Sequence, residues 1–75
     1  MRYYITIAEV DYQGYYKGNN FVINSEGKWA NENAEPMYFD TEEEAVVYAG
    51  NHIRENDINL IRFDVSVCKE PEVEE

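Results

Sequence analysis

The sequence predicts an α+β domain in which a small antiparallel sheet carries one helix packed on one face. Residues 2–10 and 59–68 have the β-branched, aromatic and alternating composition of strands. A capped amphipathic helix is expected between them, over residues 41–55. A chain of 75 residues has room for one domain only. The predicted element order, β-β-β-α-β, favours a sheet with its helix on a single face.

The first two predicted strands flank a segment rich in turn-forming residues. Residues 2–10 form the first strand. Residues 11–20 contain two glycines and an Asn-Asn pair, which predict a tight hairpin or a wider loop with a short strand at residues 15–16. The next strand is expected at residues 21–24, and a turn at residues 25–28.

The third strand is expected at residues 37–39, directly before the helix, because residues 29–36 are polar. Thr41 is the expected N-cap of the helix and accepts a hydrogen bond from the amide of Glu44. The acidic side chains that follow Thr41 favour the positive end of the helix dipole.

The helix periodicity places Ala45, Ala49 and Ile53 on one face, which we expect to pack on the sheet. Gly50 inside the helix costs about 1 kcal/mol relative to alanine. We attribute this glycine to a close approach of the helix to the sheet. Glu43, Glu44 and Val47 are expected to face solvent.

The last strand shows the clearest alternation, with Ile61, Phe63, Val65 and Val67 separated by polar residues. Its apolar face is expected to pack on the helix. We place a single α+β domain at residues 1–69 and a disordered acidic tail at residues 70–75.

The charge is the most unusual feature of the composition. Sixteen acidic residues against six basic ones give a net charge of −10. Such a chain repels the phosphates of nucleic acids and anionic membranes, so neither is expected as a direct partner. A basic protein surface is the natural complement, and a groove that holds nucleic acid is one such surface. Solubility alone is an equally weighted explanation of the acidity.

The sequence offers few groups for catalysis or metal binding. It contains one histidine, His52, and one cysteine, Cys68, which are too few for a zinc site and predict neither an enzyme nor a cofactor. His52 is expected to have a structural role in the last turn of the helix. A lone reduced cysteine, with neither a signal peptide nor an apolar membrane segment, favours the cytoplasm.

Two surfaces are candidates for binding a partner protein. The first is acidic and lies at the start of the helix: Asp40, Glu43, Glu44 and Val47. Its alternative explanation is helix capping on a solvated face. The second is aromatic and comprises the loop tyrosines Tyr12, Tyr15 and Tyr16, with Trp29 as a further candidate. Tyrosines give large contact areas at low entropic cost, but they are equally expected to complete a small core.

Residues 37–49, Met-Tyr-Phe-Asp-Thr-Glu-Glu-Glu-Ala-Val-Val-Tyr-Ala, resemble a strand-to-capped-helix junction found in small proteins of phages and mobile elements. Small size and strong acidity also resemble anti-CRISPR and other anti-defence inhibitors. The resemblance implies a partner among host nucleic-acid enzymes and a location in the host cytoplasm.

The leading hypothesis is therefore a phage-type inhibitor that mimics DNA. Its acidic surface would occupy the basic nucleic-acid groove of a host defence enzyme. The first alternative is a structural or assembly module that forms a homodimer through an exposed edge strand. The second is a small-ligand-binding domain that uses the tyrosine-rich loop.

Overall fold

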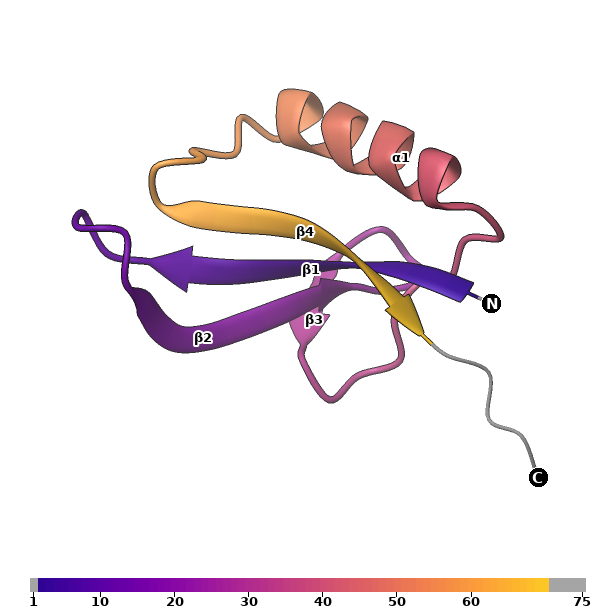
Figure 1. Ribbon diagram of the computed structural model, residues 1–75, viewed down its shortest axis with the longest axis horizontal. Coiled ribbons are helices and arrows are strands. Elements are labelled where there is room, and N and C mark those ends of the chain that lie inside the picture. The colour runs from indigo at the N-terminus through magenta and orange to yellow at the C-terminus, as the bar shows by residue number, and fades with distance from the viewer. Residues whose placement is uncertain (1, 71–75) are drawn as a thin grey trace.

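A computed structural model describes residues 2–70 of the chain as a four-stranded antiparallel sheet with one helix on one face (Figure 1). The elements follow one another in the predicted β-β-β-α-β order: β1 (Arg2–Val10), β2 (Tyr16–Ile23), β3 (Trp29–Asn31), α1 (Glu42–Glu55) and β4 (Phe63–Glu70). Their order in space is β3-β2-β1-β4, so the first and last strands are neighbours.

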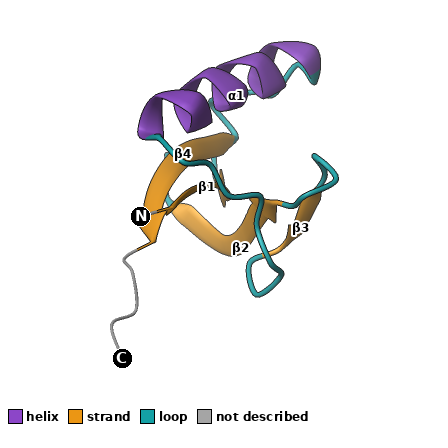
Figure 2. Cartoon of the chain, turned by 90° about the vertical axis from the view of Figure 1, so that its right-hand side faces the viewer, coloured by secondary structure: helices purple, strands orange, loops and turns teal. Residues whose placement is uncertain are grey.

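The core lies between α1 and the sheet face beneath it (Figure 2). Ile5 and Ile7 of β1 and Ile23 of β2 are completely or almost completely buried there, against Ala45 and Ala49 of α1. Half-buried apolar side chains surround this centre: Tyr3, Phe21, Trp29, Phe39, Tyr48, Phe63, Val65 and Val67. The helix packs over β1 and β4, because small alanines let its backbone approach these strands.

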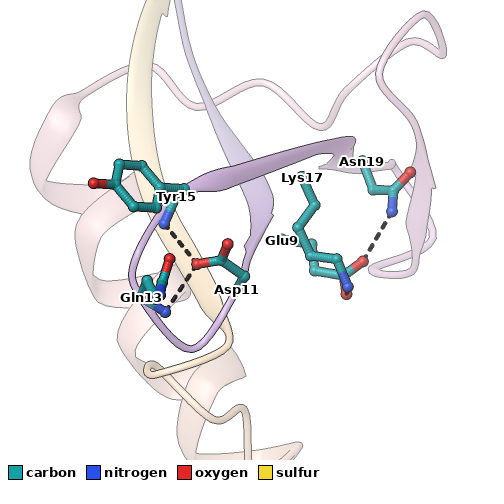
Figure 3. Close-up of polar contacts among 6 residues, drawn as sticks. All are labelled: Glu9, Asp11, Gln13, Tyr15, Lys17 and Asn19. Atoms are coloured by element: carbon teal, nitrogen blue, oxygen red, sulfur yellow. Dashed lines mark hydrogen bonds and ion pairs between the residues drawn. The ribbon is translucent and has the colours of Figure 1, made fainter.

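β2 is one continuous strand, where we predicted a turn-rich loop followed by a shorter strand. Its pairing with β1 changes register between Ala8 and Val10, so that three residues of β2 lie opposite Glu9. Gly18 takes a φ of 85°, a conformation that glycine adopts without steric cost. Lys17 and Asn19 both hydrogen-bond the Glu9 carboxylate (Figure 3). The turn-forming residues therefore build a bulge within a strand.

The third strand is a different segment from the one predicted. β3 pairs with the end of β2, through Val22 with Ala30 and Ile23 with Trp29, whereas residues 37–39 contribute only an isolated bridge from Phe39 to Tyr3. The prediction was wrong because it judged residues 29–36 by their polarity, and the Trp29 side chain alone brings the start of that segment to the core.

α1 begins and ends where the sequence predicted. Thr41 is the N-cap, and its hydroxyl accepts from the Glu44 amide at 3.2 Å. The expected reason for Gly50 was wrong: this residue is exposed, and a Cβ built on it would meet no atom within 4 Å. Within residues 2–70, no helix has the length and apolar character needed to cross a membrane.

β4 begins four residues later than predicted and includes Glu70, which we had assigned to the tail. Glu70 lies opposite Arg2 of β1, and their side chains form an ion pair at 3.2 Å. Ile61 precedes the strand and is 73% exposed, because Asn59 holds residues 59–62 in a turn by accepting from the amides of Ile61, Arg62 and Phe63. Residues 71–75 of the predicted tail lie outside the described residues.

Candidate functional site

Three of the four residues predicted for the acidic surface line one groove. It has a volume of about 610 Å³ and runs along the N-terminal half of α1. We call it the acidic groove and define it by its lining residues: Phe39, Thr41, Glu43, Glu44, Val47, Tyr48 and Asn51. Asp40, the fourth predicted residue, is exposed beside Thr41 but does not line the groove.

Two aromatic side chains form the apolar part of the acidic groove. The rings of Phe39 and Tyr48 lie 5.3 Å apart. Phe39 is held by two backbone hydrogen bonds to Tyr3, of 3.0 and 2.8 Å. The Tyr48 hydroxyl lies only 2.9 Å from the point where a Cβ of Gly27 would stand. This tyrosine therefore packs against the turn at a residue that has no side chain. Both rings are therefore supported by the sheet.

The acidic groove combines two kinds of surface that suit a basic side chain. Glu43 and Glu44 are exposed carboxylates, and Val47 is 57% exposed beside them. The stem of a lysine or arginine can lie along apolar and aromatic surface while its charged head meets the carboxylates. A guanidinium can also form paired hydrogen bonds with a carboxylate.

Sequence reasoning missed Phe39, Tyr48 and Asn51 as groove residues. A signal for two of them was present in the helix period, because Tyr48 lies four residues after Glu44 and Asn51 lies four residues after Val47. No comparable signal exists for Phe39, which reaches the groove only through its bridge with β1.

The predicted tyrosine surface lies at the other end of the molecule. The hairpin between β1 and β2 and the start of α1 occupy opposite ends of the long axis in Figure 1. Tyr12, Tyr15 and Tyr16 are 84%, 67% and 68% exposed. They do not complete the core, and the fold does not bring them to the acidic groove.

The hairpin that carries the tyrosines is ordered by one carboxylate. Asp11 Oδ1 accepts from the amides of Gln13 at 2.8 Å and of Tyr15 at 3.0 Å (Figure 3). Gly14, at φ 88°, donates its amide to the carbonyl of Asp11. The Tyr16 hydroxyl donates to Asp64 of β4 at 2.9 Å, and this hydrogen bond raises the pKa of Tyr16.

Two apolar residues that the sequence did not single out as exposed lie at the hairpin end. Leu60 and Ile61 are 59% and 73% exposed in the turn before β4. This turn lies beside the end of β1, since the amide of Val10 donates to the carbonyl of Arg62 at 2.7 Å. Together with the three hairpin tyrosines they form what we call the hairpin-end surface.

Trp29 and His52 belong to the core and not to a binding surface. Trp29 Nε1 donates to His52 Nε2 at 2.9 Å, and the indole packs on Phe21 and Phe63 at ring distances of 5.6 and 5.2 Å. His52 is only 8% exposed. Because its Nε2 accepts a hydrogen bond from the indole N–H, the histidine links α1 to β3. Its role is structural, but it lies in the core and not on the flank of the helix, where it was expected.

Cys68 and His52 lie on opposite faces of the sheet. Cys68 faces away from α1, with its Sγ 3.5 Å from the Thr6 hydroxyl, and the two therefore do not form a nucleophile and base pair. Within residues 2–70, no group of three His, Cys, Asp or Glu side chains is placed to hold a metal ion.

The sheet face that α1 does not cover has its own polar cluster near the start of β1. The Arg2 guanidinium lies 3.7 Å from the centre of the Tyr38 ring and also pairs with Glu70. Hydrogen bonding to Glu70 raises the pKa of Tyr38, and burial raises the pKa of Tyr4. These contacts fasten Tyr38 and the end of β4 to β1, so we assign them a structural role.

A comparison of this chain with known protein families, with curated proteins and with solved structures found no match. The function must therefore be argued from the residues and geometry described above.

Proposed function

We propose that this chain is a non-catalytic inhibitor that binds a partner protein through the acidic groove. The observation that carries the proposal is the combination of Glu43 and Glu44 with the supported rings of Phe39 and Tyr48 in a single hollow. A lone row of carboxylates would attract any cation. A hollow with an aromatic wall instead favours a side chain that has both an apolar stem and a cationic head.

The partner that fits best is a basic protein surface of the kind that holds nucleic acid. The net charge of −10 would speed association with such a surface and oppose binding to nucleic acid itself. We further propose a phage-type role, in which the chain occupies the nucleic-acid groove of a host defence enzyme in the cytoplasm. The hairpin-end surface would contribute to binding only if the partner is long enough to contact both ends of the molecule.

The test compares two double charge reversals of equal net charge. Glu43→Lys with Glu44→Lys changes the acidic groove, and Glu32→Lys with Glu35→Lys changes two exposed acids outside it. Each chain is used to capture proteins from a bacterial lysate. We expect a nucleic-acid enzyme that is retained by the native chain and by the control, is released by duplex DNA, and binds the groove variant at least about tenfold more weakly.

Raised salt should weaken the same complex, because its charges lie at the surface and are screened. A captured partner that binds the groove variant and the native chain equally well would overturn the proposal. So would a partner that duplex DNA does not displace.

A further inference from the structure

β4 has one edge with no neighbouring strand in the part of the chain that the structure describes. It runs for eight residues at the end of the β3-β2-β1-β4 order, and it pairs with β1 alone. The opposite edge of the sheet is different, because β3 is only three residues long. Natural proteins commonly protect an edge by shortness, by proline, by a bulge or by charged side chains. β3 uses the first of these devices, whereas residues 63–70 contain no proline and pair with β1 without a change of register. The charged residues of β4 are Asp64, Lys69 and Glu70, and they leave residues 65–68 uncharged.

The backbone groups that this edge presents follow from the pairing with β1. The amide of Val10 donates to the carbonyl of Arg62, so these two residues form a directly bonded pair, and the next pair along the strands is Glu9 with Phe63. Directly bonded pairs alternate along an antiparallel ladder. The even-numbered residues of β4 therefore bond to β1, and Val65, Val67 and Lys69 direct their N–H and C=O groups outward.

We propose that two copies of this chain form a homodimer in which β4 pairs antiparallel with β4 of the second copy, about a two-fold axis at Ser66. The two sheets would then form one continuous sheet, with both helices on the same face. We choose a second copy as the occupant of this edge because the sequence of β4 is complementary to itself when the axis lies at Ser66.

The axis at Ser66 gives two kinds of favourable opposite pair, one beside the axis and one at each end of the contact. Val65 lies opposite Val67 of the second copy, and Arg62 lies opposite Glu70, which places opposite charges together at both ends. An axis shifted by one residue, to Val67, would instead place Asp64 opposite Glu70. Like charges directly opposite each other destabilise a sheet, so this register is disfavoured.

The helix side of the edge also has unused apolar surface. Tyr48 faces the β2–β3 turn at Gly27, so Val46 and Gly50, on the opposite side of α1, face toward the free edge of β4. Val46 is 51% exposed, and there is open space where a Gly50 side chain would stand. The incoming strand would bring its own valines beneath this side of the helix, and a glycine leaves room for that approach.

The dimer would form through the β4 edge, whereas the wall of the acidic groove at Glu44 and Tyr48 lies on the other side of α1; Glu43, three residues before Val46, lies between the two. The two associations respond to salt in opposite ways. Two chains of charge −10 repel each other, so raised salt should strengthen the dimer, whereas it should weaken a complex made through the acidic groove. Failure of one proposal can therefore be told from failure of the other.

The sharpest test is a cross-link at the proposed axis. Ser66 would face itself in a non-bonded pair with a Cα–Cα distance of about 4.5 Å, which is within the range that a disulfide requires. We would introduce Ser66→Cys into a Cys68→Ser chain. As a control we would use Ser25→Cys with Cys68→Ser, because Ser25 is exposed in the β2–β3 turn. Under mild oxidation we expect the Ser66→Cys chain to give a covalent dimer at least about tenfold faster than the control.

Sedimentation equilibrium measures the association of the native chain directly. We expect the mass to rise from 8.8 kDa toward twice that value between micromolar and millimolar concentration, more readily at high salt. Ser66→Lys should restore the monomer by opposing two like charges at the axis, whereas Ser25→Lys, with the same net charge, should not. A native chain that stays monomeric at millimolar concentration and high salt would overturn the proposal. Equal cross-linking rates at the two positions would also overturn it.

Discussion

The two ends of the molecule both expose apolar side chains, but they support them differently. At the end where α1 begins, Phe39 and Tyr48 are half-buried, pack on each other and extend into the core cluster. At the hairpin end, Tyr12 and Tyr15 are 84% and 67% exposed and project from a turn that is held by the Asp11 carboxylate and by backbone hydrogen bonds within the turn. The aromatic side chains at the first end therefore belong to the folded core, whereas those at the hairpin end project into solvent.

This difference shows how each end can be tested for binding. A change in the wall of the acidic groove alters stability and binding together, so its effect on binding can be interpreted only after stability has been measured. A change of Tyr12 or Tyr15 removes exposed area and little else, so it reports on binding alone, whereas Tyr16 also donates a hydrogen bond to Asp64.

The largest effect is expected for Tyr48→Ala. This substitution removes a half-buried ring that packs on Phe39 at 5.3 Å and stacks on His52 at 6.2 Å. We expect the free energy of unfolding to fall by about 2 kcal/mol, which is less than for a fully buried ring. Tyr12→Ala is the matched control and should stay within about 0.5 kcal/mol of the native chain. Urea unfolding measures both, and equal losses would remove the distinction between the two ends.

Thr41→Ala should give the next largest effect. It removes the side chain that accepts the Glu44 amide at the start of α1. The expected loss is about 1 kcal/mol, measured by thermal or urea unfolding. Thr41→Ser keeps the hydroxyl and should recover most of that loss. If both variants were equally unstable, the hydroxyl at position 41 would not be the group that stabilises the start of α1.

At the hairpin end, Asp11→Ala should loosen the turn and leave the core unchanged. Its carboxylate accepts from the amides of Gln13 and Tyr15. We expect a loss of about 0.5–1.5 kcal/mol, together with faster hydrogen exchange at these two amides. Asp11→Asn retains an acceptor oxygen and should exchange more slowly than the alanine variant. Faster exchange in α1 would show that the two ends are more strongly coupled than the contacts indicate.

The smallest expected effect is a pH dependence at the bulge beside the hairpin. Hydrogen bonds from Asn19 and then from Lys17 lower the pKa of Glu9 from its usual 4.5. A carboxyl whose pKa is lower in the folded state stabilises the fold above its unfolded pKa, and this contribution is lost as the pH falls through the folded pKa. The stability difference between the native chain and Glu9→Gln should therefore shrink as the pH falls below about 4.5. A difference that is constant with pH would contradict the assignment.

Several elements could be predicted from local sequence because their causes are local. The helix from Glu42 to Glu55 follows from Thr41, the acids of the first turn and the spacing of Ala45 and Ala49. β1 follows from a run of β-branched and aromatic residues. The exposure of Glu43, Glu44 and Val47 also follows from the helix period, and the structure confirms it.

Other features could not be predicted because they depend on contacts between distant residues. Residues 17–19 look like a turn, but they form a bulge since the Glu9 carboxylate is there to accept from them. The polar segment after Trp29 contributes a strand because the indole reaches His52 and Phe63. The exposure of Ile61 is set by the turn at Asn59, which an alternating pattern does not reveal.

The sequence by itself determined the α+β class, the capped helix and the placement of acidic side chains on its solvent face, because capping and helical periodicity act within a few residues. Only the tertiary structure decided that Phe39 joins Glu43 and Glu44 in one groove, that the tyrosines lie at the opposite end, and that β4 has β1 as its single neighbouring strand within residues 2–70. These features depend on which strands become neighbours, and strand order is set by the burial of the whole core and not by any local run of residues.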